Sequence, residues 1–187
     1  MEKSKQQEAQ EKTAKVQSRV VHTSRVFFLR EDTVQIAGRP TKTWDIIVHP
    51  GAVVIIPVND RGELLLVKQW RRAAAQVVIE LPAGTLEEDE PIFTCAQREL
   101  QEETGYLAKE LIPFGGCYTI PGYCTEYLHF FLALGLQHSP LPPDEDEQID
   151  LVAISLDKAL EMIDNGLIND AKTIAGILRY ERWLKKQ

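Results

Sequence analysis

The chain has 187 residues and a formal net charge of −7, which is long enough for one well-filled hydrophobic core. The negative charge argues against a nonspecific nucleic-acid binder, because that class needs a basic face. No apolar run approaches the roughly 20 residues needed to span a bilayer, so we expect no membrane partner. The cysteines lack paired metal-type spacing, and we expect free thiols in a cytoplasmic protein; they are Cys95, Cys117 and Cys124.

The N-terminal part is expected to contain a polar tail and a small sheet. Residues 1–19 are almost entirely polar and lack the apolar core of a secretory signal, so we expect a tail that is disordered, frayed or partly helical. Short strands are expected at 25–30, 33–36 and 43–48, separated by turns at Glu31-Asp32 and at 37–40. We assign residues 20–48 to this antiparallel sheet, which has little core of its own and is a candidate surface for a partner subunit.

Residues 49–187 are expected to form one mixed domain. Two apolar strands at 52–58 and 63–70 indicate a hairpin across the turn at 59–62. Further strands are expected at 77–81, 111–118, 127–134 and 149–154, and helices at 91–104, 156–163 and 170–184. The predicted fold class is therefore α/β, an α+β sandwich with a mixed β-sheet packed between helices.

The expected helix from Pro91 to Thr104 carries several glutamates on one side. Glu99, Glu102 and Glu103 fall within an arc of about 100°, because offsets of three and four residues return to one helix face. Like charges at this spacing destabilise a helix unless a cation lies among them. A solvated acidic face is the alternative, but the glycine loop before the helix can approach a metal or phosphate closely and favours a divalent-metal site.

The segment from Gly84 to Tyr106 resembles the Nudix box. That pattern is Gly, five residues, Glu, seven residues, Arg-Glu, an apolar residue, any residue, Glu-Glu, any residue, Gly and an apolar residue. Only Tyr106 departs from it, replacing the usual aliphatic residue, and all fixed positions are present: Gly84, Glu90, Arg98, Glu99, Glu102, Glu103 and Gly105. The resemblance implies the Nudix fold and hydrolysis of a nucleoside diphosphate linked to another group.

The same resemblance implies a Mg²⁺ site, with Mn²⁺ as an alternative cation. Glu99 and Glu103 would be direct ligands, and Glu102 would act in catalysis by helping to bind the metal or its water. Glu90 is expected either to cap the helix or to pair with Arg98. The box residues with structural roles would be Gly84, Glu90, Arg98 and Gly105.

The residues on either side of the box resemble the ADP-ribose pyrophosphatase branch of the family. The carbonyl of Ala83 would be a further metal ligand, and Arg71 would hold a phosphate because a guanidinium can contact it in bidentate fashion. Pro121 lies near the position that marks ADP-ribose hydrolases, although Pro-Gly alone is typical of an ordinary turn. Glu126 would contact the ribose side, and further implied substrate contacts are Thr85, Pro121 and Gly122.

Two more segments are implied in binding and catalysis. Trp44 and Asp45 resemble an adenine site, a stacking aromatic beside a hydrogen-bonding acid, which relatives complete with the partner subunit. A Trp packed at the edge of the small sheet is the alternative. In the acidic loop at 144–147, Glu145 would be the general base and Glu147 a metal ligand, although a solvated loop has the same composition. Which of the two loop glutamates is the base stays open.

The sequence therefore predicts a homodimeric, Mg²⁺-dependent hydrolase that converts ADP-ribose to AMP and ribose 5-phosphate. One alternative is the hydrolysis of another nucleotide sugar such as GDP-mannose. The other is a ligand-binding regulator that does not catalyse. The expected partner is a small-molecule nucleoside diphosphate, with neither nucleic acid nor membrane.

Overall fold

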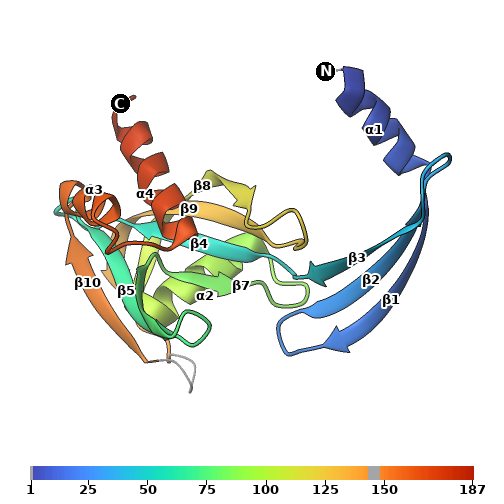
Figure 1. The fold of residues 1–187 in the computed structure, drawn as a ribbon. Helices are drawn as coiled ribbons and strands as arrows, with labels where there is room; N and C mark the ends of the chain where they lie inside the picture. Colours follow the sequence, from blue (N-terminus) through green and yellow to red (C-terminus); the bar gives the residue numbers. More distant parts are fainter. Residues whose placement is uncertain (1, 143–147) are drawn as a thin grey trace. The chain divides into compact units, whose positions relative to one another are not determined.

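The computed structural model describes residues 2–142 and 148–187 (Figure 1). The chain divides into two compact units. Unit 1 comprises Met1–Pro50 and Tyr118–Glu126, and unit 2 comprises Gly51–Cys117 and Tyr127–Gln187. Among the described residues, no helix has the length and apolar character needed to cross a membrane.

Unit 1 contains one helix and a three-stranded antiparallel sheet in the order β1-β2-β3. Its elements are α1 Glu2–Lys12, β1 Lys15–Thr23, β2 Phe28–Gln35 and β3 Lys42–Val48. The start of β1 and the length of β2 differ from the expectation. Residues 2–12 form α1, in agreement with a partly helical tail, whereas β1 begins at Lys15, where a strand was not expected. The turn expected at Glu31-Asp32 lies inside β2, so the strands expected at 25–30 and 33–36 are one strand.

These corrections have a common physical cause, because the elements concerned carry little apolar periodicity. Every residue of β1 is exposed, and α1 is polar on all sides, with a Glu8–Lys12 ion pair of 2.6 Å one turn apart. Asp32 is buried within β2. A hydrogen bond with Ser18 and the neighbouring Arg30 hold the pKa of Asp32 below its ordinary value despite its burial.

The segment Tyr118–Glu126 belongs to unit 1 because it pairs with the end of β3. Cys124 forms a parallel bridge with Ile47. The backbone N–H of Ile47 donates to the carbonyl of Tyr123 at 2.8 Å, and the N–H of Thr125 donates to the carbonyl of Ile47 at 2.9 Å. The loop expected to contact the substrate and the strand that carries Trp44 are therefore parts of one unit.

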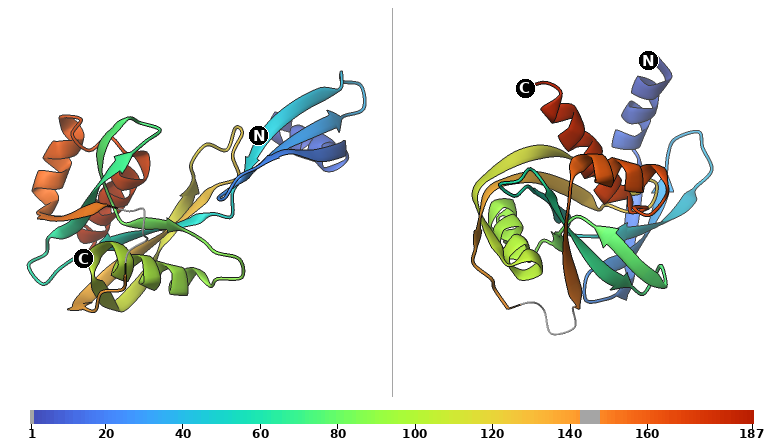
Figure 2. Two further views of the ribbon diagram at one scale, coloured as in Figure 1. Left: turned by 90° about the horizontal axis from the view of Figure 1, so that it is seen from below. Right: turned by 90° about the vertical axis from the view of Figure 1, so that its left-hand side faces the viewer.

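Unit 2 contains a four-stranded sheet in the order β7-β4-β9-β8 and a three-stranded sheet in the order β10-β5-β6 (Figure 2). The strands are β4 Ala52–Pro57, β5 Leu64–Arg71, β6 Gln76–Glu80, β7 Ala83–Thr85, β8 Tyr106–Tyr118, β9 Tyr127–His138 and β10 Ile149–Ile154. The helices are α2 Ile92–Thr104, α3 Leu156–Asp164 and α4 Ala171–Leu184. Strand β4 runs parallel to β9 and antiparallel to β7, so the sheet is mixed as expected.

The strands β4 and β5 do not form the ladder expected of a hairpin. A tight turn joins them, in which the side-chain oxygen of Asn59 accepts hydrogen bonds from the N–H groups of Arg61 and Glu63 at 2.9 and 3.0 Å. Beside this turn, Val58 and Leu64 form one isolated bridge. Strand β4 belongs to the four-stranded sheet, whereas β5 belongs to the three-stranded sheet. Their continuous apolar sequences indicate central strands but do not specify which strands pair.

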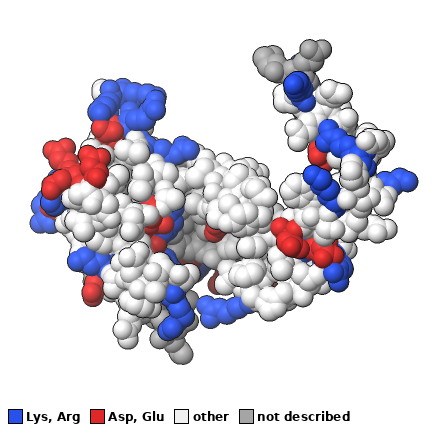
Figure 3. All heavy atoms as spheres, in the orientation of Figure 1, with Lys and Arg blue, Asp and Glu red and all other residues white. Residues whose placement is uncertain are grey.

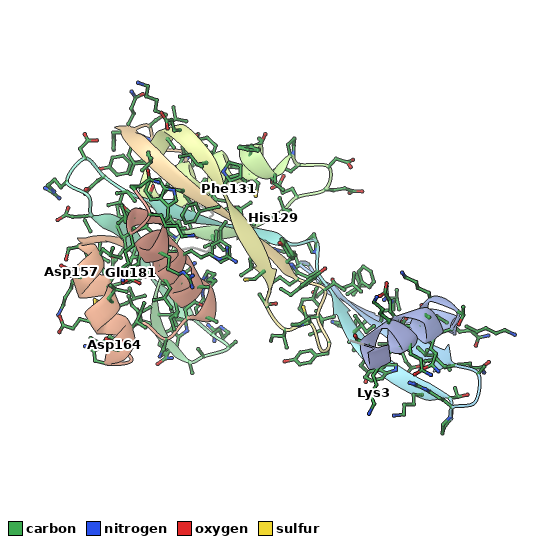
Figure 4. The ribbon with its side chains drawn as sticks, turned by 90° about the horizontal axis from the view of Figure 1, so that it is seen from above. Lys3, His129, Phe131, Asp157, Asp164 and Glu181 are labelled. Carbon is green, nitrogen blue, oxygen red and sulfur yellow. The ribbon has the colours of Figure 1, made fainter. Side chains whose placement is uncertain are left out.

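Strand alternation gives the sheet around β4 and β9 two buried faces. One face packs on α3 and α4, and its largest fully buried residues include Ile56 and Phe130. The opposite face packs on α2, where the ring centroids of Phe93 and Phe131 lie 5.0 Å apart in a T-shaped arrangement. Figure 4 labels Phe131 on β9. Figure 2 shows α2 on one side of these strands and the C-terminal helices on the other. A mixed sheet between helices is confirmed.

Candidate active site

The segment from Gly84 to Tyr106 forms the loop that leaves β7 and the helix α2 that follows it. The helix ends at Gly105, which has the left-handed conformation with φ of 78°. Pro91 is the N-cap residue, and no side chain caps the helix. The carboxylate of Glu90 instead accepts two hydrogen bonds from Arg98, at 2.9 and 3.0 Å. Of the two roles expected for Glu90, the pairing with Arg98 is therefore the one observed.

The C-terminal part of α2 carries Glu99, Glu102 and Glu103, here called the acidic turn, and Arg98 lies beside it. Its Nη1 donates to Glu99 at 2.7 Å and to Glu102 at 2.9 Å, in addition to its contacts with Glu90. Hydrogen bonding to Arg98 holds the pKa of Glu90 below its ordinary value, and the hydrogen bonds with Glu90 raise the pKa of Arg98. One guanidinium thus offsets the repulsion among three carboxylates.

Two carboxylates of the helix pack against the backbone of the loop. A Cβ atom on Gly84 would lie 1.8 Å from Cδ of Glu99, so residue 84 has to be glycine for Glu99 to occupy its position. The N–H of Ala83 donates to Oε2 of Glu103 at 3.0 Å, and Glu103 is buried. The loop and the acidic turn are therefore positioned by each other.

Cys95 connects the start of this loop to the helix. Its thiol donates to the carbonyl of Thr85 at 3.7 Å and accepts from Arg98 at 3.5 Å. Burial raises the pKa of Cys95, so the thiol stays neutral at physiological pH. Thr85 is thereby held through its backbone next to the acidic turn.

The oxygen donors of this turn fit a divalent cation of the Mg²⁺ type, which prefers carboxylates and backbone carbonyls. Within residues 2–142 and 148–187, no three acidic, histidine or cysteine side chains are arranged so that they could hold a metal ion. In this arrangement Arg98 binds Glu99 and Glu102, while the backbone binds one oxygen of Glu103. Glu145 and Glu147 lie outside the described residues.

A cavity of about 580 Å³ lies beside the acidic turn and is lined by Glu102 and Glu103. This volume is in the range of small-molecule sites. The remaining lining residues come from β5, β6 and the region of β10: Lys68, Trp70, Val77, Gln148, Ile149 and Asp150. The sequence reasoning missed Lys68, although strand alternation places it on the same face of β5 as Trp70.

Arg71 lies on the opposite face of β5 from Lys68 and contacts Glu80 in bidentate fashion, at 2.7 and 3.0 Å. Glu80 is buried and also accepts a hydrogen bond from Lys172. Lys172 in turn donates to Asp170 at 2.9 Å. The residue expected to hold a phosphate is thus anchored by a buried carboxylate, and 42% of its side chain is exposed.

Trp44 and Asp45 point to opposite faces of the unit 1 sheet, as neighbours on a strand do. Trp44 pairs across the strands with Asp32, and the two line a cavity of about 530 Å³. Asp45 lies on the other face, near Arg19, whose pKa is raised mainly by Glu31 and partly by Asp45. The acid that shares a face with Trp44 is therefore Asp32.

The expected substrate loop forms a turn at Pro121 and Gly122, with open space around Gly122. Glu126 lies at its end, and Oε1 of Glu126 is 3.7 Å from Nδ1 of His49. The backbone N–H of Glu126 donates to the thiol of Cys124 at 3.4 Å. These residues are brought together within unit 1, whereas the acidic turn and Arg71 belong to unit 2.

Comparison with curated proteins gives relatives that match most of the chain. An ADP-ribose pyrophosphatase of Bacillus subtilis (strain 168) is 37% identical over 160 residues, which is 84% of this chain and 86% of the relative. A methanol dehydrogenase activator of Bacillus methanolicus is 35% identical over 90% of this chain and 91% of the relative. A GDP-mannose pyrophosphatase of Citrobacter koseri (strain ATCC BAA-895 / CDC 4225-83 / SGSC4696) is 32% identical over 79% of this chain and 84% of the relative.

The fold and a family model agree with these relatives. A solved structure described as an ADP compounds hydrolase superposes with a TM-score of 0.83 at 22% identity, covering 93% of this chain and 95% of that chain. This likeness shows a shared fold. The NUDIX domain model matches residues 48–176, which include the whole loop and helix described above. The chain belongs to the Nudix family of hydrolases.

Proposed function

We propose that the protein hydrolyses the diphosphate bond of a nucleoside diphosphate sugar, and that ADP-ribose is its substrate, giving AMP and ribose 5-phosphate. The observation that carries this proposal is the acidic turn held against the loop, with Glu103 bound by Ala83 and Glu99 packed on Gly84. A fixed set of carboxylates beside a cavity of ligand size suits a diphosphate bound through a cation. The relative named ADP-ribose pyrophosphatase supports the choice of substrate.

The proposed cofactor is Mg²⁺, with Mn²⁺ as the alternative cation. Glu99, Glu103 and the carbonyl of Ala83 would hold it, together with Glu147 from outside the described residues. When bound, the ion would polarise the phosphorus, neutralise developing charge and lower the pKa of the attacking water.

The protein's own side chains would bind and orient the diphosphate and move the proton. Glu145 would accept the proton of the attacking water, and Glu102 would help to hold that water. Arg71, anchored by Glu80, would contact a phosphate oxygen. The proposed contacts to the nucleoside and sugar are Trp44, Asp45, Thr85, Pro121, Gly122 and Glu126.

We further propose that the protein is a cytoplasmic homodimer. The sheet of unit 1 exposes large apolar side chains, with Val16, Val20 and Trp44 each more than half exposed at 52%, 57% and 51%. Such a surface is suited to burial by a second copy. The cysteines are free thiols, which fits a reducing compartment.

The first alternative is a different nucleotide sugar, and it is favoured by the relatives named GDP-mannose pyrophosphatase. A ligand-binding regulator without catalysis is the second alternative. The presence of Glu99 and Glu102 on Arg98 and of Glu103 on Ala83 argues against it, because a protein that only binds ligand has no need for these carboxylates.

A substrate panel tests the function directly. The purified protein is incubated with ADP-ribose, GDP-mannose and ADP-glucose in Mg²⁺ or Mn²⁺, and nucleotide release is measured for each. E103Q should abolish metal-dependent turnover, whereas E110Q, which changes an exposed glutamate on β8, should not. Fastest release of GMP from GDP-mannose would favour the first alternative. Binding of ADP-ribose without AMP release would favour the regulator, and full activity of E103Q would overturn the proposed metal site.

A further inference from the structure

We propose that Lys68 and Trp70 form the subsite for the sugar-phosphate half of the substrate, an inference that rests on the proposed hydrolysis of a nucleoside diphosphate sugar. Both residues lie on one face of β5. Both line the cavity that Glu102 and Glu103 also line. The sugar-phosphate half would then lie next to the carboxylates where the diphosphate bond is hydrolysed.

The register of the three-stranded sheet defines this wall of the cavity. Lys68 pairs across the strands with Asp150 on one side and Ile79 on the other, and Trp70 pairs with Val77. Cross-strand partners share a face of the sheet, so an ammonium group lies beside an apolar pair. Trp70 and Val77 are 55% and 58% exposed, which leaves their apolar surfaces accessible to a ligand.

Among the described residues, no carboxylate forms an ion pair with Lys68, although three of them line its cavity. Within the described part of the chain, this partly buried lysine forms no ion pair within 4.0 Å. The neighbouring cations differ from it, because Arg71 contacts Glu80 and Lys172 contacts both Glu80 and Asp170. Asp150, Glu102 and Glu103 line the same cavity, but an ammonium group that forms no ion pair with them is available to an anionic ligand such as phosphate.

The spacing of the two side chains matches a sugar phosphate. Residues i and i+2 on one strand face are about 6.6 Å apart, comparable to the span of a sugar ring and its phosphate. The indole of Trp70 offers a flat apolar surface for the C–H face of the ring, while Lys68 would donate to a phosphate oxygen.

Equilibrium binding of the two reaction products tests this subsite without relying on turnover. Binding of ribose 5-phosphate and of AMP is measured by calorimetry in Mg²⁺ for the wild type, K68M, K68R and W70L. K68M should weaken ribose 5-phosphate about tenfold or more and change AMP by less than about twofold. K68R should retain most of the binding, and W70L should weaken ribose 5-phosphate selectively. With ADP-ribose, the KM of K68M should rise more than its kcat falls.

Control variants and outcomes separate this inference from the proposed function. K158M removes an exposed lysine of α3 that pairs with Glu161, and it should leave both affinities unchanged. Unchanged ribose 5-phosphate binding in K68M and W70L would overturn the subsite, as would an equal loss for AMP or no ribose 5-phosphate binding by the wild type. If the panel identifies GDP-mannose as substrate, mannose 1-phosphate and GMP take the place of these probes. Failure of the proposed function itself would appear as no nucleotide release by the wild type from any nucleotide sugar.

Discussion

Gly84 illustrates how closely the loop and the acidic helix fit together. A Cβ atom at this position would lie 1.8 Å from the carboxyl carbon of Glu99. Because a carboxylate is the far end of a flexible side chain, the fold should survive G84A while the carboxylate moves. We expect G84A to raise the Mg²⁺ concentration for half-maximal activity or to lower kcat by about 10- to 100-fold. Steady-state rates over a Mg²⁺ series, with a thermal unfolding scan for the fold, measure this. Wild-type rates at every Mg²⁺ concentration would contradict it.

Arg98 makes the stability of the acidic turn depend on pH. Its removal in R98M leaves Glu90, Glu99 and Glu102 without their shared cation. These side chains are only 10%, 12% and 19% exposed, so we expect a loss of about 3 kcal/mol in the free energy of unfolding at neutral pH without metal. Urea denaturation in EDTA measures it, and R182M, which removes an exposed arginine of α4, is the control.

The sign of the pH effect follows from Glu90. Hydrogen bonding to Arg98 lowers the folded-state pKa of Glu90 below its ordinary 4.5, so the stabilisation is present above pH 4.5 and is lost as the pH falls below that value. R98M lacks this contribution. The difference in unfolding free energy between wild type and R98M should therefore be largest at neutral pH and shrink below about pH 4.5. A difference that stays constant through the acid range would contradict the role given to Arg98.

At the scale of elements, the N-terminus of α4 connects the helix to the strand that precedes the active-site loop. Asp170 is the N-cap residue and accepts hydrogen bonds from the backbone and hydroxyl of Thr173 and from Lys172. Thr173, fully buried, accepts from the N–H of Leu81 at 2.8 Å. Although burial alone would raise the pKa of Asp170, Lys172 and Thr173 lower it below its ordinary value.

We therefore expect D170A to destabilise the protein by about 2 kcal/mol, the upper end of the range for N-cap residues. The matched variant S155A removes the N-cap of α3, where the serine accepts one hydrogen bond from the N–H of Lys158. S155A should cost about 1 kcal/mol or less. Urea denaturation of both variants tests the order. If S155A is as destabilising as D170A, the additional contacts of Asp170 contribute nothing.

The elements that could be predicted from sequence are those with a strong periodic pattern and clear ends. The helix α2 combines an apolar stripe with a glycine at its C-terminus, and the structure confirms both. The strand β1 could not be predicted, because both of its faces are exposed and it has no buried stripe. The pairing of β4 and β5 was wrong for a different reason: two strands can be adjacent in sequence, joined by a tight turn and still belong to different sheets.

In the candidate site, too, the residues that share one element could be predicted from sequence, and those joined by tertiary packing could not. Spacing in sequence was sufficient to place Glu99, Glu102 and Glu103 together, because one helix determines their relative positions. Lys68 and Trp70 join them only through tertiary packing, which no local pattern records. Figure 3 shows basic and acidic side chains interspersed on the visible face, so charge alone would not have located the cavity.

At the scale of the whole molecule, we expect a second copy to cover the sheet of unit 1. Strand β1 is a nine-residue edge strand with every residue exposed, which leaves it open to pairing or burial by another chain. Val16 and Val20 share one face of β1, and Val16 pairs across the strands with Val34. Gln17 points to the other face, so it offers a matched position for a control.

We expect the wild type to sediment at twice the chain mass, and V16E/V20E to weaken self-association about 100-fold or more, because burying two carboxylates without partners costs several kcal/mol. Q17E adds a negative charge on the opposite face and should associate as the wild type does. If a second copy completes the proposed adenine site, as we propose, the KM for ADP-ribose should rise with dissociation and fall again as protein concentration increases. Sedimentation equilibrium and initial rates over a protein dilution series measure both effects. A wild type that is monomeric throughout, or a V16E/V20E dimer as tight as the wild type, would show that this face is not the interface.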